Sequence, residues 1–198
     1  MTVPDRIEAA RLLRSLEPPD WLLRHSRAVA EVAAFLAART AQRGVQVDRR
    51  LAEAAALLHD ADKALPPTDP LRGLGHGYGS AGWLAQRGSS ELAPAVEHHP
   101  VTRLRDGDWF ERWLRESRAE DRIVAYADKR AQQRLVTLDA RFGRWRRRHP
   151  VRWDDDAVAE VRRRANRLES VVCEAAGLRP EDVRRLAWTS TAFRAAGA

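Results

Sequence analysis

The sequence contains few of the residues that form cross-links or membrane spans. Cysteine occurs once, at Cys173, which excludes an internal disulfide and a cluster of thiolate metal ligands. Charged residues interrupt every apolar run well before 18 residues, so no membrane-spanning helix is predicted. The first residues lack the apolar core of a signal peptide. We therefore expect a cytoplasmic protein that does not engage a membrane.

Lysine is nearly absent from a chain that is otherwise basic. The formal net charge is +7, yet only Lys63 and Lys129 are lysines among the 35 basic residues. The positive charge predicts an anionic partner, either a phosphate-bearing small molecule or a nucleic acid. A bulky planar guanidinium cannot always replace an ammonium at a phosphate. Lys63 and Lys129 are therefore candidates for phosphate contacts, although two positions also fit chance.

β-branched residues are sparse as well, whereas alanine, leucine and arginine dominate, and this composition favours helix. The chain of 198 residues fits one all-α domain with a real core, and we expect no strand. Residues 1–150 are expected to form the main helical bundle, and residues 151–198 a C-terminal helical extension that packs on it. Asp20 and Asp48 are expected N-caps. The predicted helices cover residues 5–16, 20–41, 48–63, 78–86, 90–98, 109–114, 119–147, 154–176 and 181–195.

An arginine-rich tract, RFGRWRRRHP, occupies residues 141–150. Arginines interleaved with Trp145 could bind phosphates and stack on the bases of a nucleic acid. The alternative is a solvated helix end, where cations meet the negative end of the helix dipole. We favour the solvated helix end, because charge runs usually lie on solvated faces.

Two histidine positions lie on predicted buried helix surfaces. His25 shares the apolar stripe of its helix with Val29 and Val32, although a single inward histidine is more often a hydrogen-bonded core residue. His59 and Asp60 are adjacent at the end of the alanine- and leucine-rich segment AAALLHDADK. A buried carboxylate is normally paired or bound to metal, because burying it alone costs several kcal/mol. Imidazole and carboxylate together suit Zn, Fe or Mn. The alternative is an ion pair among Asp60, Asp62 and Lys63 at the helix end.

Four further residues extend this pattern. Asp128 follows apolar residues on its helix and directly precedes Lys129. His76 is flanked by glycines, which allow close approach of the backbone at a helix start. His98 and His99 end a helix, and since neighbouring helical residues point about 100° apart, only one of the two should face a shared centre.

These segments, in this order, resemble the HD superfamily of metal-dependent phosphohydrolases, an all-helical family named for its adjacent His-Asp pair. The resemblance covers residues 20–148. An HD dipeptide alone would be weak, whereas five segments in the right order on suitable helices are specific. The segments are RHSRAVAEVA around His25, ALLHDADK at His59-Asp60, LGHGYGSAGWL at His76, AVEHHP at His98-His99 and IVAYADKR at Asp128.

The resemblance implies a ligand set. The first His, the His-Asp pair and the last Asp bind one metal, and two intervening histidines add a second metal that the Asp of the pair bridges. For the second metal we favour His99, with His98 as the alternative. The cofactor implied is a pair of divalent transition metals, with Fe or Mn favoured over Zn, Ni or Mg. The implied metal ligands are His25, His59, Asp60, His76, His99 and Asp128.

The resemblance also implies an activity. Asp60 and Lys63 are the expected catalytic residues: a water that the two metals bridge attacks phosphorus as hydroxide, and Lys63 contacts the substrate phosphate. Asp62 could orient the water or protonate the leaving group, but we favour an ordinary solvated carboxylate at a helix end. Arg103 and Arg130 are candidates for contacts to distal phosphates.

The chain departs from the subfamilies that cleave cyclic dinucleotides and alarmones. It looks most like the bacterial symmetrical dinucleoside tetraphosphate hydrolases, although the segment from His99 to Asp128 is longer. The expected substrate is a small phosphate compound, a nucleotide or a dinucleoside polyphosphate, and a nucleic-acid partner is not expected. The alternatives are a basic helical protein that binds nucleotide or nucleic acid around a retained metal site, and a structural bundle with core histidines. The C-terminal helices either cover the core or mediate a homodimer.

Overall fold

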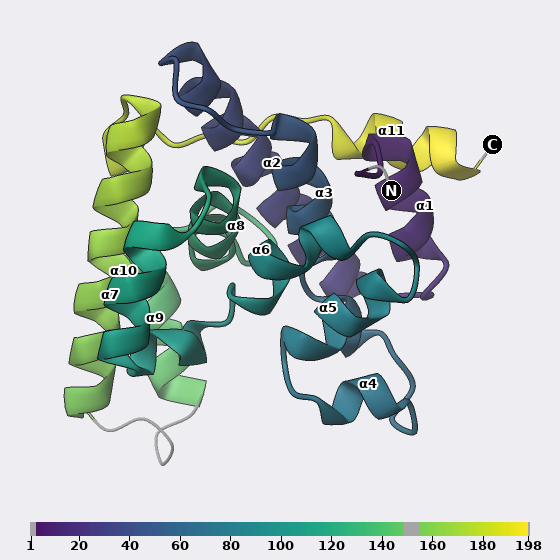
Figure 1. Cartoon of the computed structure of the whole chain (residues 1–198), viewed down its shortest axis with the longest axis horizontal. Helices are drawn as coiled ribbons and strands as arrows, with labels where there is room; N and C mark the ends of the chain where they lie inside the picture. Colours follow the sequence, from purple (N-terminus) through teal and green to yellow (C-terminus); the bar gives the residue numbers. More distant parts are fainter. Residues whose placement is uncertain (1–2, 149–154, 198) are drawn as a thin grey trace.

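The computed structural model describes residues 3–148 and 155–197, and it confirms the expected all-helical fold (Figure 1). Within these residues there is no strand, only an isolated bridge between Ala131 and Leu135. Nor does any helix in the described ranges have the length and apolar character that crossing a membrane requires. The α-helices are α1 Arg6–Arg14, α2 Asp20–Gln42, α3 Arg49–Leu58, α4 Pro70–Gly73, α5 Tyr78–Ala85, α6 Ala93–Glu97, α7 Gly107–Glu116, α8 Ala119–Arg130, α9 Leu138–Arg148, α10 Asp155–Ala176 and α11 Thr189–Gly197.

Helices α2, α3 and α8 pack against one another and form the centre of the bundle. Alanine side chains on α2 and α3 are buried almost throughout, and such small side chains let two helices approach closely. Asp48 caps α3 as predicted, since its side chain accepts the Leu51 N–H at 3.0 Å. The cap of α2 is Pro19 and not Asp20, which lies in the first turn of the helix. The ends of these three helices meet at one place, where the candidate site lies.

The predicted helix over 119–147 is wrong, because the chain leaves the helical conformation at Ala131 (φ −126°, ψ 139°) and resumes it in α9. Tertiary contacts stabilise this break. The Val136 N–H donates to the Arg130 carbonyl at 2.7 Å, and the Gln132 carbonyl lies 2.7 Å from Nδ1 of His25. The break therefore supplies a hydrogen-bond acceptor to the site and turns α9 back toward it.

Three other boundaries differ from the prediction. The helix expected over 48–63 ends at Leu58, and a short 3-10 turn over Ala61–Lys63 follows it. The loop expected over 66–75 contains the short α4. The helix expected over 181–195 begins only at Thr189, because the preceding segment crosses α2, where the Leu186 N–H donates to the Glu31 carbonyl at 3.0 Å.

The two C-terminal helices lie against different parts of the bundle (Figure 1). Helix α10 packs on α2, α8 and α9, while α11 lies beside α1. The buried Arg130 of α8 contacts Glu169 of α10 at 3.1 Å, and the Tyr126 hydroxyl donates to the same carboxylate at 2.6 Å. The domain boundary expected at residue 150 and the helix start expected at Asp154 lie outside the described residues.

Candidate metal centre

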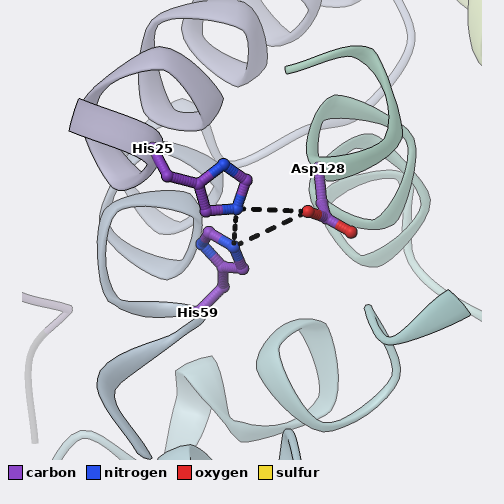
Figure 2. Close-up of side chains that lie close together, drawn as sticks. All are labelled: His25, His59 and Asp128. Carbon is purple, nitrogen blue, oxygen red and sulfur yellow. Dashed lines mark hydrogen bonds and ion pairs between the residues drawn. The ribbon is translucent and has the colours of Figure 1, made fainter. Parts of the chain in front are cut away.

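Three helix ends bring a first group of ligand atoms together (Figure 2). His25 projects from the first turns of α2, His59 is the C-cap of α3, and Asp128 lies near the end of α8. Nε2 of His25 lies 3.2 Å from Nε2 of His59 and 3.3 Å from Oδ1 of Asp128. Oδ2 of Asp60 lies 3.4 Å from both imidazole nitrogens. Two nitrogens and two carboxylate oxygens therefore converge on one point.

A second group surrounds the other oxygen of Asp60. Nε2 of His76 and Nε2 of His99 lie 3.3 and 3.4 Å from Oδ1 of Asp60, and 3.2 Å from each other. His99 is buried, whereas His98 points away toward Glu97 and the Trp109 ring. Of the two neighbouring histidines, the structure brings His99 to Asp60. The carboxylate of Asp60 thus faces one pair of imidazoles with each of its oxygens.

The other ring nitrogen of each histidine faces a fixed oxygen. Nδ1 of His25, His59 and His99 lies 2.7, 2.7 and 2.5 Å from the carbonyls of Gln132, Ala56 and Val96 respectively. Nδ1 of His76 lies 3.0 Å from a carboxylate oxygen of Asp62. A carbonyl or carboxylate only accepts, so each Nδ1 carries the proton and each Nε2 presents a lone pair to the centre. Metal-bound histidines show this arrangement almost always.

The donor set fits divalent metals. Metal–nitrogen bonds of about 2.0–2.1 Å place neighbouring ligand atoms roughly 3.0–3.4 Å apart. The separations in both groups are 3.2–3.4 Å, except for 3.9 Å between Nε2 of His59 and Oδ1 of Asp128. Oδ1 of Asp60 is buried and has no hydrogen-bond partner among the described residues, which is costly unless a cation binds it. Lone pairs of four imidazoles facing two carboxylates need positive charge between them. Nitrogen and oxygen donors without thiolate suit Fe, Mn, Zn or Ni.

Burial and neighbouring charges set the protonation states of this centre. Burial lowers the pKa of His59 to about 3, and it also lowers the pKa of His99, so both rings are neutral as a metal requires. Burial would raise the pKa of Asp60, yet His59 and Lys63 outweigh it and hold that pKa well below its ordinary value. For His25 burial is again the largest effect, but Asp128 and Asp60 together overcome it and raise the pKa.

Asp62 is not the solvated carboxylate that the sequence suggested. Its side chain is 6% exposed and accepts hydrogen bonds from three donors. Oδ2 lies 3.0 Å from Nδ1 of His76 and accepts the Gly77 N–H at 3.2 Å, while Oδ1 accepts the Ser80 hydroxyl at 2.9 Å. Burial raises the pKa of Asp62, but the hydrogen bond from His76 and the electrostatic effect of that ring lower the pKa on balance. Asp62 therefore orients His76 from behind.

A comparison with known protein families identifies the family to which this chain belongs. The HD domain model matches residues 22–132, which is more than half of the chain. The chain belongs to the HD domain family. Neither the curated proteins nor the solved structures contain a significant match to it. HD domains are generally metal-dependent phosphohydrolases, and the buried His and Asp groups of this HD domain protein fit such a metal site.

Two cations contact the carboxylates of this HD domain. Nζ of Lys63 donates to Oδ2 of Asp60 at 2.7 Å, and Nη2 of Arg141 lies 3.1 Å from Oδ1 of Asp128. Each of them thus reaches the oxygen that faces His25. Sequence reasoning found Lys63 through its spacing from the His-Asp pair but missed Arg141, because the break at Ala131 that brings α9 over the centre leaves no local signal.

An open pocket of about 1120 Å³ leads to the candidate metal centre of the HD domain. Its wall includes Asp60, Asp128 and Lys63, and the indoles of Trp21 and Trp145. The arginine-rich tract contributes to this wall from α9. Arg144 and Arg148 are exposed, as expected of a solvated helix end, yet they line the pocket and do not simply face bulk solvent. His149 and Pro150 of that tract lie outside the described residues.

The arginines proposed from sequence for distal phosphates have other roles in the HD domain. Arg130 is buried and held by Glu169 and by the carbonyls of Val136 and Pro180, so it is a structural residue. The guanidinium of Arg103 lies over the Tyr78 ring at 4.4 Å and is outside the pocket wall described above. Lys129 is also buried, and its ammonium donates to the carbonyls of His99 and Ala125, both at 2.9 Å. Its position links α8 to the segment that carries His99.

Proposed function

We propose that this HD domain protein is a phosphohydrolase that uses two divalent metals to cleave a phosphate ester or anhydride of a nucleotide or dinucleoside polyphosphate. The arrangement of Asp60 carries the proposal: Oδ2 faces His25 and His59, and Oδ1 faces His76 and His99. A carboxylate whose two oxygens each face a pair of neutral imidazoles is suited to bridge two cations. A core histidine that serves packing alone has no need of such a partner.

The side chains divide into ligands and substrate contacts. His25, His59, Asp60 and Asp128 would hold one metal, and Asp60, His76 and His99 the other. Metals bound there supply an acidified water as nucleophile and neutralise charge on the phosphoryl group. Lys63, exposed beside Asp60, is placed to contact the phosphoryl oxygens as charge develops on them. Iron or manganese is the preferred pair of ions for this mixed nitrogen and oxygen donor set.

The pocket supports a nucleotide-sized substrate. A volume of about 1120 Å³ exceeds what a phosphate group alone would fill, and its wall carries both cations and indoles. These features support a nucleotide or dinucleoside polyphosphate, in keeping with the resemblance to the symmetrical dinucleoside tetraphosphate hydrolases.

Two neighbouring histidines provide a matched test. The purified chain, its His99→Ala variant and its His98→Ala variant are loaded with Mn²⁺ or Fe²⁺, and their metal content and turnover are measured on a panel of phosphate esters and dinucleoside polyphosphates. We expect His99→Ala to lose one metal per chain and at least about a hundredfold in kcat, since a removed ligand disrupts activation of the nucleophile. His98→Ala should retain both metals and turnover.

The result that would overturn the proposal is equally clear. A wild-type protein that retains two metals but turns over nothing on the panel would leave a non-enzymatic binder around a retained metal site. Unchanged metal content in both His99→Ala and His59→Ala would refute the ligand assignment itself, because a high-affinity site cannot lose a ligand without losing affinity.

A further inference from the structure

One face of α9 adjoins the core and the next face lines the pocket. Leu138 and Phe142 are buried in the core. Positions i, i+3, i+4 and i+7 share a helix face, and counting from residue 141 this face carries three arginines and one tryptophan. All four residues line the pocket: Arg141, Arg144, Trp145 and Arg148. Arg146 and Arg147 fall outside this face, and Arg146 pairs with Asp155 at 2.6 Å.

Among the described residues, positively charged side chains outnumber carboxylates around the pocket. Asp60 and Asp128 are the carboxylates that line it within the described ranges, and both belong to the metal centre. Lys63, Arg134 and the three arginines of α9 line the same space. Two divalent metals would add four further positive charges. A single phosphate group offsets at most about two of these positive charges, whereas a chain of phosphates offsets more of them.

The length and chemistry of the face indicate what lies along it. The rise of a helix places Arg148 about 10 Å beyond Arg141, a distance longer than one phosphate group. Arg141 contacts the ligand Asp128, so the row of arginines begins at the metal centre and leads away from it. Trp145 lies between Arg144 and Arg148 in sequence, and Trp21 also lines the pocket. Indole rings stack on nucleobases without regard to sequence.

We infer that the α9 face formed by Arg141, Arg144, Trp145 and Arg148 is a binding subsite for the polyphosphate arm and base of a nucleotide whose reacting phosphate lies at the metal centre. This inference rests on the proposed function and adds the residues that set substrate preference. Guanidinium groups bind phosphate oxygens in pairs, and several in a row select for substrates with more than one phosphate.

Charge-matched double variants on the same helix test the inference. The first double variant, Arg144→Gln with Arg148→Gln, is called the pocket pair and removes two cations from the α9 face that lines the pocket. The second, Arg146→Gln with Arg147→Gln, is called the control pair and removes two cations from outside that face. Binding of AMP and of β,γ-methylene-ATP to the Mn²⁺-loaded full-length chain is measured by calorimetry, and hydrolysis of p-nitrophenyl phosphate is followed in parallel. We expect the pocket pair to weaken binding of the triphosphate analogue by at least about tenfold, since each lost charged hydrogen bond is worth at least that factor.

The control pair separates a subsite from general charge. AMP binding should change less than about threefold in either double variant, and the control pair should leave binding of the analogue within the same limit. Equal losses in both pairs would overturn the inference, as would an unchanged affinity of the pocket pair for the analogue. The inference would also be overturned, in favour of a nucleic-acid ligand, if a single-stranded oligonucleotide bound wild type more tightly than the analogue does and the pocket pair abolished that binding.

The two proposals fail in different ways. Absent turnover on every substrate, together with loss of analogue binding in the pocket pair alone, would refute the phosphohydrolase and support the subsite. Hydrolysis of p-nitrophenyl phosphate by all variants, with unchanged binding of the analogue, would support the phosphohydrolase and overturn the subsite.

Discussion

Replacing Asp62 with asparagine should weaken one metal position of the two. Asparagine keeps the shape of the side chain but removes its charge and turns one oxygen into an amide donor. The hydroxyl of Ser80 can accept from that amide, so the oxygen of the new side chain remains available to His76 and Gly77. The fold should therefore persist while the hold on His76 becomes weaker.

The magnitude follows from the contacts of Asp62. The bond between the buried carboxylate of Asp62 and Nδ1 of the exposed His76 spans 3.0 Å, and hydrogen bonds to charged groups contribute about 1.5–3 kcal/mol. Loss of the charge also lowers the basicity of His76 toward a metal. Changes to such outer partners of a histidine ligand cost roughly 10- to 100-fold in metal affinity. That factor corresponds to about 1.4–2.8 kcal/mol at the site of His76 and His99.

The assay is a competitive titration of Mn²⁺ with a chelator, together with metal content per chain after gel filtration. We expect wild type to hold two ions and Asp62→Asn to hold one tightly and one weakly. Asp69→Asn is the matched control: Asp69 caps α4 through the Leu71 N–H, and asparagine caps equally well. Two equally tight ions in Asp62→Asn would refute the reasoning that Asp62 supports His76.

Three further outcomes can be measured. Gly77→Ala should lower the thermal midpoint and the metal content, because Gly77 has φ +87° and an added Cβ would lie 2.9 Å from the Glu97 carbonyl oxygen. A variant with the midpoint and metal content of wild type would contradict this. Metal binding should release protons near neutral pH, because the raised pKa of His25 keeps that ring protonated at higher pH than usual and a metal binds only the neutral ring. Metal affinity should therefore fall as pH drops. Calorimetry in buffers of different ionisation enthalpy that detects no proton release would refute this. Glu169→Gln should reduce the free energy of unfolding by about 2 kcal/mol in urea titrations, because it leaves the buried Arg130 without its carboxylate; a loss below about 0.5 kcal/mol would show that the carbonyl contacts suffice.

Local sequence patterns were sufficient to predict the helical fold and most residues of the candidate metal centre. Alanine- and leucine-rich helices that end abruptly in histidine and aspartate indicate where buried polar atoms must meet, so His59, Asp60 and Asp128 could be singled out one segment at a time. The choice between His98 and His99 depends on the angle at which α6 meets the bundle, which its five residues do not reveal.

Contacts between distant segments decided the rest. Residues 131–137 contain neither glycine nor proline, so their pattern continues that of a helix. The chain nevertheless breaks there, where the bond between His25 and the Gln132 carbonyl and the packing of α9 on α10 are made. Asp62 likewise looked solvated because its partner Ser80 lies 18 residues further along the chain. Both misjudgements concern groups that support the centre, not the ligands themselves.

The break between α8 and α9 separates two tasks along the chain. Every proposed metal ligand precedes Ala131, whereas the proposed substrate-reading face follows it and is anchored by Leu138 and Phe142. A combinatorial library at Arg144 and Arg148 could therefore be screened for new phosphate substrates without altering a proposed ligand or the ring contact of Trp145 with Phe142. Such a library would vary the substrate-binding face of α9 while the proposed catalytic residues stay constant.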